Sequence, residues 1–177
     1  MEGSCFVMDK NVMAARMATL ARVAKALEEN RMEAHVVESR EALLEALEKM
    51  LPKGASIASG GSMTLAETGV NGLLQRGDYD FYFRGRTGAD GQPVDVYRAA
   101  FSCDWYFSSS NAITEDGCLY NVDGNANRVA ALCFGPRKVV IIAGYNKIVR
   151  NLHAAAERVR AIAAPANCIR LERSGSR

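Results

Sequence analysis

The chain has 177 residues and a formal net charge of +2, with 49% hydrophobic and 24% charged residues. These values are close to those of an average soluble globular domain, and this length favours one domain that buries about two-thirds of its unfolded surface. No run approaches the ~20 apolar residues of a membrane helix, and residues 1–5 lack the pattern of a signal peptide. The composition therefore predicts a cytoplasmic protein and argues against secretion and membrane spanning.

The cysteines and histidines argue against a metal centre in this chain. The cysteines are odd in number, scattered and without a C-x-x-C pair, and only His35 and His153 could supply imidazole ligands. We expect reduced thiols and no metal site. The cysteines are Cys5, Cys103, Cys118, Cys133 and Cys168.

Positive charge is concentrated near the C-terminus. Residues 137–177 hold nine Lys/Arg and two Asp/Glu, a balance of +7, whereas residues 1–136 have a balance of −5. A basic helix can bind nucleic acid, but this one has no aromatic residues. We interpret it as a solvated surface and expect no nucleic-acid partner.

The first third of the chain predicts alternating helices and strands. Apolar residues at steps of three and four indicate a helix from Lys10 to Arg31, with Asp9 as its N-cap. Residues 34–37 are typical of a strand, and a second helix capped by Ser39 runs to Met50 before Pro52. A buried strand over 55–58 then leads through a glycine-rich turn to a helix over 63–67.

The middle of the chain adds strands and a hairpin. We expect strands over 79–83 and 105–108, a loop over 84–91 and a short helix over 93–100. Residues 112–114 and 119–122 are predicted to pair, because Asp116-Gly117 between them is a hairpin signal. Asn127 would cap a helix over 128–134 that ends at Gly135-Pro136.

The last third completes an α/β pattern. Residues 139–144 read as the clearest buried parallel strand, and a final helix over 148–162 should stop at Pro165. This alternation predicts an α/β fold: a single domain over residues 1–177 with a mainly parallel, Rossmann-like sheet covered by helices, a small hairpin insertion, and the N-terminal helix of residues 1–31 packed on it.

The turn Gly60-Gly61-Ser62 is the first candidate site. It follows a strand and precedes a helix, so backbone N–H groups and the hydroxyls of Ser62 and Thr64 could bind an anion there. A plain connection between a strand and a helix uses the same residue types, and both interpretations stay open.

A polar run from Ser108 to Asn127 is the second candidate. Turn and capping chemistry explains many of its residues, but the Ser-Ser-Ser-Asn stretch ending at Asn111 is left without a role. Glu115 is either a surface acid at the hairpin tip or a nucleophile or general base in a cleft. Asp116 is the better candidate for the turn, so Glu115 is the stronger catalytic candidate of the two.

The third candidate is the segment after the strand over 139–144. Asn146 and Lys147 follow the carboxyl end of this strand, where open α/β sheets bind ligands. Lys147 is therefore placed to meet an anion, although it could be an exposed lysine of a first helical turn, and Arg128 is a comparable cation. We expect Glu115 and Lys147 to share one cleft. The other candidate ligand-binding side chains are Asn111, Asp123 and Asn127.

Several of these segments resemble signatures of the lactate-utilisation (LUD) domain family. They are residues 60–69 (GGSMTLAETG), 109–129 (SSNAITEDGCLYNVDGNANRV), 144–149 (GYNKIV) and 163–167 (AAPAN). The resemblance covers nearly the whole chain. It implies the α/β fold of ribose-5-phosphate isomerase, glucosamine-6-phosphate deaminase and family I CoA transferases, in which a glycine-rich turn holds phosphate. It also likens Glu115 to the CoA-transferase nucleophile.

The resemblance implies a role in lactate or related organic-acid metabolism. Three functions compatible with it stay open: an accessory component of an oxidising complex with iron–sulfur partner subunits, a stand-alone enzyme acting on a phosphorylated or CoA-linked substrate, and a non-catalytic metabolite sensor. All three predict a small anionic metabolite or phosphate-bearing cofactor as ligand. The cofactor is unknown, and homo-oligomerisation stays open. Relatives of this type often have a Cys-rich C-terminal extension, whereas only Cys168 follows Asn167 here.

Overall fold

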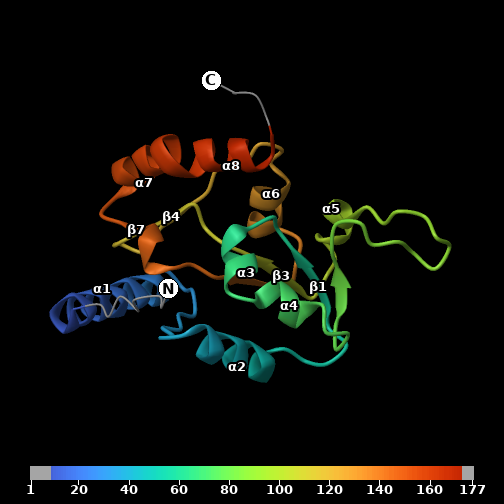
Figure 1. The fold of residues 1–177 in the computed structure, drawn as a ribbon, viewed down its shortest axis with the longest axis horizontal. Helices are drawn as coiled ribbons and strands as arrows, with labels where there is room; N and C mark the ends of the chain where they lie inside the picture. The colour runs from blue at the N-terminus through green and yellow to red at the C-terminus, as the bar shows by residue number, and fades with distance from the viewer. Residues whose placement is uncertain (1–8, 173–177) are drawn as a thin grey trace, which may run out of the picture.

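The first two helices begin at the predicted caps. A computed structural model describes residues 9–172 (Figure 1). In α1 (Lys10–Glu29), the Asp9 carboxylate accepts hydrogen bonds from the first-turn N–H groups of Asn11 and Val12. In α2 (Arg40–Met50), the Ser39 hydroxyl accepts one from Ala42. Both caps satisfy backbone donors that a helix start leaves free.

The segment between these helices is not the predicted strand. Residues 32–37 have no ladder partner, and Val36 and Val37 are exposed. A β-rich composition is insufficient for a strand when no neighbouring strand is available to satisfy its backbone hydrogen bonds.

A four-stranded parallel sheet forms the centre of the fold. Its order is β2 (Asp80–Tyr82), β1 (Ser56–Ser59), β3 (Trp105–Ser108) and β6 (Lys138–Ile141). In its register, Ile57 pairs with Phe81 on one side and with Trp105 on the other, and Phe107 pairs with Val140. The predicted mainly parallel sheet is confirmed.

Alternating side chains place a different core on each face of this sheet. Ile57, Trp105 and Phe107 pack against α2, α3 (Met63–Glu67) and α4 (Val70–Leu74). On the other face, Ala58 and Tyr106 pack with residues near α5 (Val96–Ala99) and in α6 (Asn127–Cys133). The period of two explains this division, and helices on both faces are what a parallel sheet requires.

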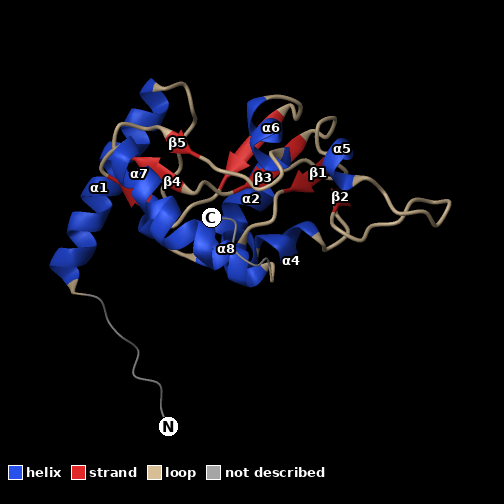
Figure 2. Cartoon of the chain, turned by 90° about the horizontal axis from the view of Figure 1, so that it is seen from above, coloured by secondary structure: helices blue, strands red, loops and turns tan. Residues whose placement is uncertain are grey.

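A second, three-stranded sheet contains the predicted hairpin. β4 (Ala112–Thr114) pairs antiparallel with β5 (Leu119–Tyr120), and β7 (Ile148–Val149) pairs parallel with the other side of β4. Gly117 occupies the left-handed region at φ +83°. The C-terminal part of α1 contacts this tip: the Asn30 amide donates to the carbonyls of Asp116 and Gly117. Both views show α1 beside this sheet (Figures 1 and 2).

Two predictions for the C-terminal third are wrong. β6 is parallel as expected, but it is an edge strand with Lys138 and Val139 exposed, because no strand lies beyond it in the described chain. Residues 148–149 are extended because they pair with β4, so α7 (Leu152–Arg158) begins only after its N-cap Asn151.

The C-terminal helix also continues past Pro165. A π-helical segment (Val159–Ala163) leads directly into α8 (Ala164–Arg170), where Pro165 occupies the first turn. Pro165, which has no N–H to donate, therefore lies just after the π-helical segment, where the hydrogen-bond pattern of the helix changes. In Figure 1 these helices form a continuous layer on one side of the molecule.

The remaining connection, from β2 to α5, is the expected loop. Residues 84–91 project away from the body of the molecule (Figures 1 and 2), with one bridge between Thr87 and Pro93. Within residues 9–172, no helix is long and apolar enough to cross a membrane.

Candidate functional site

The predicted ligand-binding segments meet at the carboxyl ends of β1, β3 and β6. The glycine turn follows β1, residues 109–111 follow β3, and a 3₁₀ turn (Tyr145–Lys147) comes shortly after β6. Because β2 and β3 flank β1 on opposite sides, the chain changes direction between β1 and β3. Open α/β sheets bind ligands at such a switch point.

Arg128 holds this region together. From α6 its guanidinium donates to the Asp123 carboxylate (2.9 Å), the Asn121 amide oxygen (2.6 Å) and the Asn111 amide oxygen (2.8 Å). It also donates to the carbonyls of Ser109 and Val122, both at 3.0 Å. These five bonds use all five N–H groups of the guanidinium. Arg128 therefore positions the loop and adds positive charge, with no donor left for a ligand.

Asp123 and Asn127 have different roles from those expected. Asn127 is the first residue of α6, not its cap, and Ala126 before it lies at φ +60° without a side-chain cap bond. Asp123 instead accepts from the Val129 N–H (2.7 Å) and pairs with Arg128. Since both of its oxygens are engaged, Asp123 anchors the helix start.

The two glycines of the turn have different surroundings. A Cβ at Gly60 would lie 2.9 Å from the Tyr106 hydroxyl and 3.1 Å from Cδ of Arg128, so packing explains this glycine. A Cβ at Gly61 would meet nothing within 4 Å. Burial raises the pKa of Tyr106 to about 12. The Ser62 hydroxyl caps α3 by accepting from the Leu65 N–H, and Thr64 lies half-buried in that short helix.

Lys147 is the most unusual cation of the site. Its side chain is half-buried, and its ammonium group donates to the Ser109 hydroxyl at 2.6 Å. Among residues 9–172, no carboxylate lies within ion-pair distance of it. Burial, with help from Arg158 and Arg128, lowers the pKa of Lys147 to about 8.

Arg158 completes the cluster from α7. Its guanidinium donates to the carbonyls of Asn146 (3.1 Å) and Asn111 (2.5 Å), which fixes the turn that contains Lys147 to the loop after β3. Burial lowers the pKa of Arg158, and its remaining N–H groups have no hydrogen-bond partner within the described chain. Asn146 itself is exposed.

The site has an excess of positive charge. Lys147, Arg128 and Arg158 face it, whereas Asp123 is the carboxylate paired within it and Glu67 acts on Lys147 only from an exposed position. Partial burial strengthens the field of these charges relative to water. An anion of low molecular weight would balance this excess.

Glu115 and Asp116 lie apart from this cluster. Both are exposed at the hairpin tip, and the Thr114 hydroxyl donates to the Asp116 carboxylate. The Glu115 N–H binds the Val149 carbonyl, but in the described part of the chain no hydrogen bond or ion pair links its side chain to Lys147. Asp116 thus stabilises the turn, as its Asp-Gly context suggests.

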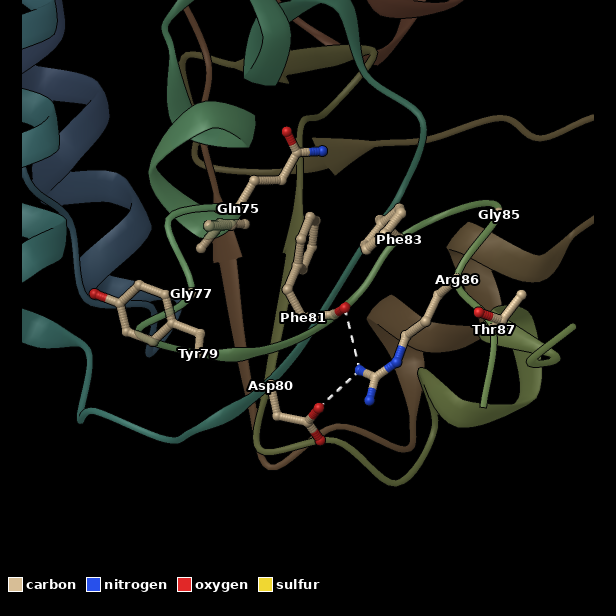
Figure 3. A pocket seen from close by; sticks show the side chains of 10 residues that line it. Gln75, Gly77, Tyr79, Asp80, Phe81, Phe83, Gly85, Arg86 and Thr87 are labelled. Atoms are coloured by element: carbon tan, nitrogen blue, oxygen red, sulfur yellow. Dashed lines mark hydrogen bonds and ion pairs between the residues drawn. The ribbon is translucent and has the colours of Figure 1, made fainter. Parts of the chain in front are cut away.

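Two cavities lie elsewhere in the described chain. The larger, about 710 Å³, lies along β2 and the loop after it, where Arg86 pairs with Asp80 and donates to the Phe81 carbonyl (Figure 3). The other, about 340 Å³, lies at the opposite ends of the strands, near Pro52 and Trp105. The second cavity is lined by exposed cations: Lys53 pairs with Asp78, Arg137 pairs with Asp104, and Lys138 lies over the Trp105 ring. We place the functional site at the carboxyl ends of the strands instead, because Lys147 there is half-buried and has no carboxylate partner among residues 9–172.

No metal-ligand cluster occurs in the described residues. They contain no group of three or more His, Cys, Asp or Glu side chains that could hold an ion. Cys103, Cys118, Cys133 and Cys168 are free thiols, and Cys5 lies outside the described residues.

Comparison with known families agrees with the resemblance noted in the sequence. The sequence model of the LUD domain matches residues 20–176. The chain belongs to the LUD domain family. Comparisons with curated proteins and with solved structures give no significant match. Membership of this family relates the chain to lactate utilisation.

Two residues of the candidate site, Ser109 and Arg158, were not predicted from the sequence. Ser109 belongs to the serine run whose role was left unexplained, and that excess of small hydroxyl residues after a strand was the available signal. Arg158 had no local signal, because its partner Asn111 lies 47 positions away.

Proposed function

We propose that this LUD protein binds a small organic anion at the carboxyl ends of β1, β3 and β6, as a component of lactate or related organic-acid metabolism. The observation that carries the proposal is the half-buried Lys147 ammonium, which contacts a neutral hydroxyl and no carboxylate of residues 9–172. An ammonium group withdrawn from water without a counter-charge is unfavourable, so an anionic ligand would stabilise it.

The neighbouring groups support a ligand with a carboxylate or phosphate. Arg158 has N–H donors without a partner among residues 9–172, and guanidinium groups bind such anions with two parallel hydrogen bonds. Open space at Gly61 leaves the backbone of the turn approachable. We therefore place the ligand between this turn, Lys147 and Arg158, with Asn146 and Thr64 at its rim.

Calorimetric titration tests the anion site. Lactate, inorganic phosphate and CoA are titrated into the native protein and into Lys147→Met, and at least one should bind the native protein. The variant should lose roughly tenfold or more in affinity, the loss expected from one charge-assisted hydrogen bond. Lys53→Met is the matched control, since its side chain is 89% exposed. Equal affinity in Lys147→Met would contradict the proposal.

The metabolic role we propose is that of an accessory component of an oxidising complex with iron–sulfur subunits. Membership of the LUD family supports this role. Affinity purification of the tagged chain from cells grown on lactate should recover iron–sulfur proteins. If the isolated chain instead turns over a phosphorylated or CoA-linked substrate, it is a stand-alone enzyme; binding without partners or turnover would indicate a sensor.

A further inference from the structure

We propose that Lys147 is a carbonyl-reactive amine that forms an imine with a small 2-oxo acid bound at this site. The inference rests on the proposed anion site and specifies its ligand class. Three features of the structure carry it: the position of the amine, the charges around it and the unused donors beside it.

The Lys147 amine is held in place by a neutral hydroxyl and not by a carboxylate of residues 9–172. Lys147 is the last residue of a 3₁₀ turn, its stem is half-buried, and its nitrogen lies 2.6 Å from Ser109 Oγ. The Ser109 carbonyl is in turn fixed by Arg128. A lysine engaged with a carboxylate would be kept as an ammonium ion, whereas the Ser109 hydroxyl can accept from the amine in either protonation state.

The charges around the amine favour its neutral form. Arg158 on α7 and Arg128 on α6 oppose its protonation, and only Glu67 on α3 favours it. With a pKa of about 8, half of the Lys147 side chains would be neutral at pH 8. A lysine of ordinary pKa, about 10.4, would be neutral roughly a hundred times less often. Desolvation and a neighbouring cation are the means by which proteins make lysine nucleophilic.

The unused donors indicate a carboxylate next to the carbonyl. Arg158 binds the carbonyls of Asn111 and of Asn146, the neighbour of Lys147, and keeps further N–H groups free. A carboxylate bound to these N–H groups would bring the adjacent carbonyl carbon of a short 2-oxo acid toward the amine. A carbonyl compound without an acid group would lack this interaction.

The chemical step balances without an added oxidant or reductant. The neutral Lys147 nitrogen attacks the carbonyl carbon and forms a C–N bond, while the carbonyl electron pair moves to oxygen. Proton transfer through solvent gives a carbinolamine, which loses water as the C=N bond forms. The products are one imine and one water, and no atom is oxidised or reduced.

Reductive trapping tests this inference. The full chain is incubated with pyruvate and sodium cyanoborohydride at pH 8, then analysed by intact mass and peptide mapping. We expect one adduct per chain, at Lys147, with at least tenfold more modification there than at Lys53, which is exposed. Acetone, which lacks the carboxylate, should label Lys147 much less than pyruvate does.

Two variants separate this inference from the proposed anion site. Lys147→Arg keeps the positive charge but cannot form the trapped adduct, and its pyruvate affinity in calorimetry reports separately on the charge at this position. Lys53→Arg should be labelled like the native protein. Pyruvate binding without a Lys147 adduct in the native protein would overturn the imine while leaving the anion site intact. Adducts spread evenly over surface lysines would also overturn the imine. If the native protein binds none of the anions in calorimetry, the proposed function is overturned.

Discussion

At the scale of single residues, Arg128 illustrates how a charged side chain near a site can be structural. Its side chain is 12% exposed and that of Asp123 is 11% exposed, so the pair is largely removed from water. The cost of that burial is offset only because every guanidinium N–H has a partner. Removing the arginine would leave Asp123 without its counter-charge and the loop after β3 without its anchor.

We therefore expect Arg128→Met to destabilise the protein strongly. The free energy of unfolding in urea should fall by about 3–5 kcal/mol, the range for breaking a buried ion pair on one side. Arg137→Met is the control, because Arg137 is 84% exposed and 3.6 Å from Asp104; its cost should stay within about 1 kcal/mol. Similar losses in both variants would contradict the structural role of Arg128.

Lys147 predicts a specific dependence of stability on pH. Burial lowers its pKa to about 8 in the folded state, whereas an unfolded lysine has a pKa of about 10.4. Below pH 8 both states are charged, and the folded state bears the cost of the buried charge. Between these pKa values the unfolded state binds more protons, so this contribution to stability rises with pH.

The measurement compares native protein with Lys147→Met at pH 7 and pH 10. At pH 7 the variant should gain relative stability, about 1 kcal/mol after allowing for solvent screening of a half-buried side chain. This relative gain should shrink toward pH 10. Anion affinity of the native protein should fall over the same range, as Lys147 loses its proton. A pH-independent difference would show that Lys147 has an ordinary pKa.

Glu115 is tested separately from the anion site. Its side chain is exposed at the hairpin tip, so Glu115→Gln should leave anion affinity unchanged. If Glu115 is nonetheless a general base or nucleophile, any turnover of the native protein should fall about 10²–10⁴-fold. Full turnover in this variant would remove its catalytic role, and the same change at Asp116 (Asp116→Asn) reports on the turn instead.

At the scale of elements, the contact between α1 and the hairpin is determined by a glycine. A Cβ at Gly117 would lie 2.6 Å from the Ala26 carbonyl oxygen, in addition to the strain of φ +83°. Gly91 has a comparable φ of +74° with nothing within 4 Å. Gly91→Ala should therefore cost about 1–2 kcal/mol from strain alone, and Gly117→Ala should cost clearly more in urea unfolding. Equal costs would mean that α1 moves away freely.

Local sequence signals predicted most elements, and long-range pairing explains the exceptions. Asp9 and Ser39 act as caps because their side chains reach donors two or three residues away. Residues 148–149 have a helical pattern of apolar residues, but their pairing with β4, more than thirty positions earlier, makes them extended. A local pattern does not show which distant strand a segment will pair with. For the same reason, the sequence of residues 34–37 does not show that they lack a partner strand.

The site shows the same division. From sequence alone, the carboxyl-end rule placed Lys147 at the ligand-binding edge of the sheet and predicted that Glu115 shares this edge. It could not show that Arg128 has no free donor. Nor could it show that Glu115 lies beyond the Thr114–Val149 pair at one end of the β4–β7 ladder, whereas Lys147 precedes the Ile113–Ile148 pair at the other end. The number of hydrogen bonds that a side chain makes and the register of paired strands are properties of the folded structure. The contact of Arg158 with Asn111 also appears only in that structure.

At the scale of the whole molecule, hydrogen bonds to the loop between β3 and β4 connect the two sheets. The loop between β3 and β4 joins them covalently, and Arg128 and Arg158 bind Asn111 within this loop from two different helices. We propose that residues 1–177 fold as one domain, because neither sheet could keep these buried donors satisfied if the other unfolded.

This coupling predicts a single cooperative unfolding transition. Trp105 is the only tryptophan and lies in β3, so its fluorescence reports on the four-stranded sheet. Far-UV circular dichroism reports largely on the helices, of which α1 contacts the smaller sheet. The two urea transitions of the native protein should coincide. Arg158→Met removes the hydrogen bonds to Asn146 and Asn111. The urea midpoints measured by fluorescence and by circular dichroism should both fall in this variant. Separate transitions already in the native protein would show that the sheets are independent units and that the anion site between their loops forms only when both are folded.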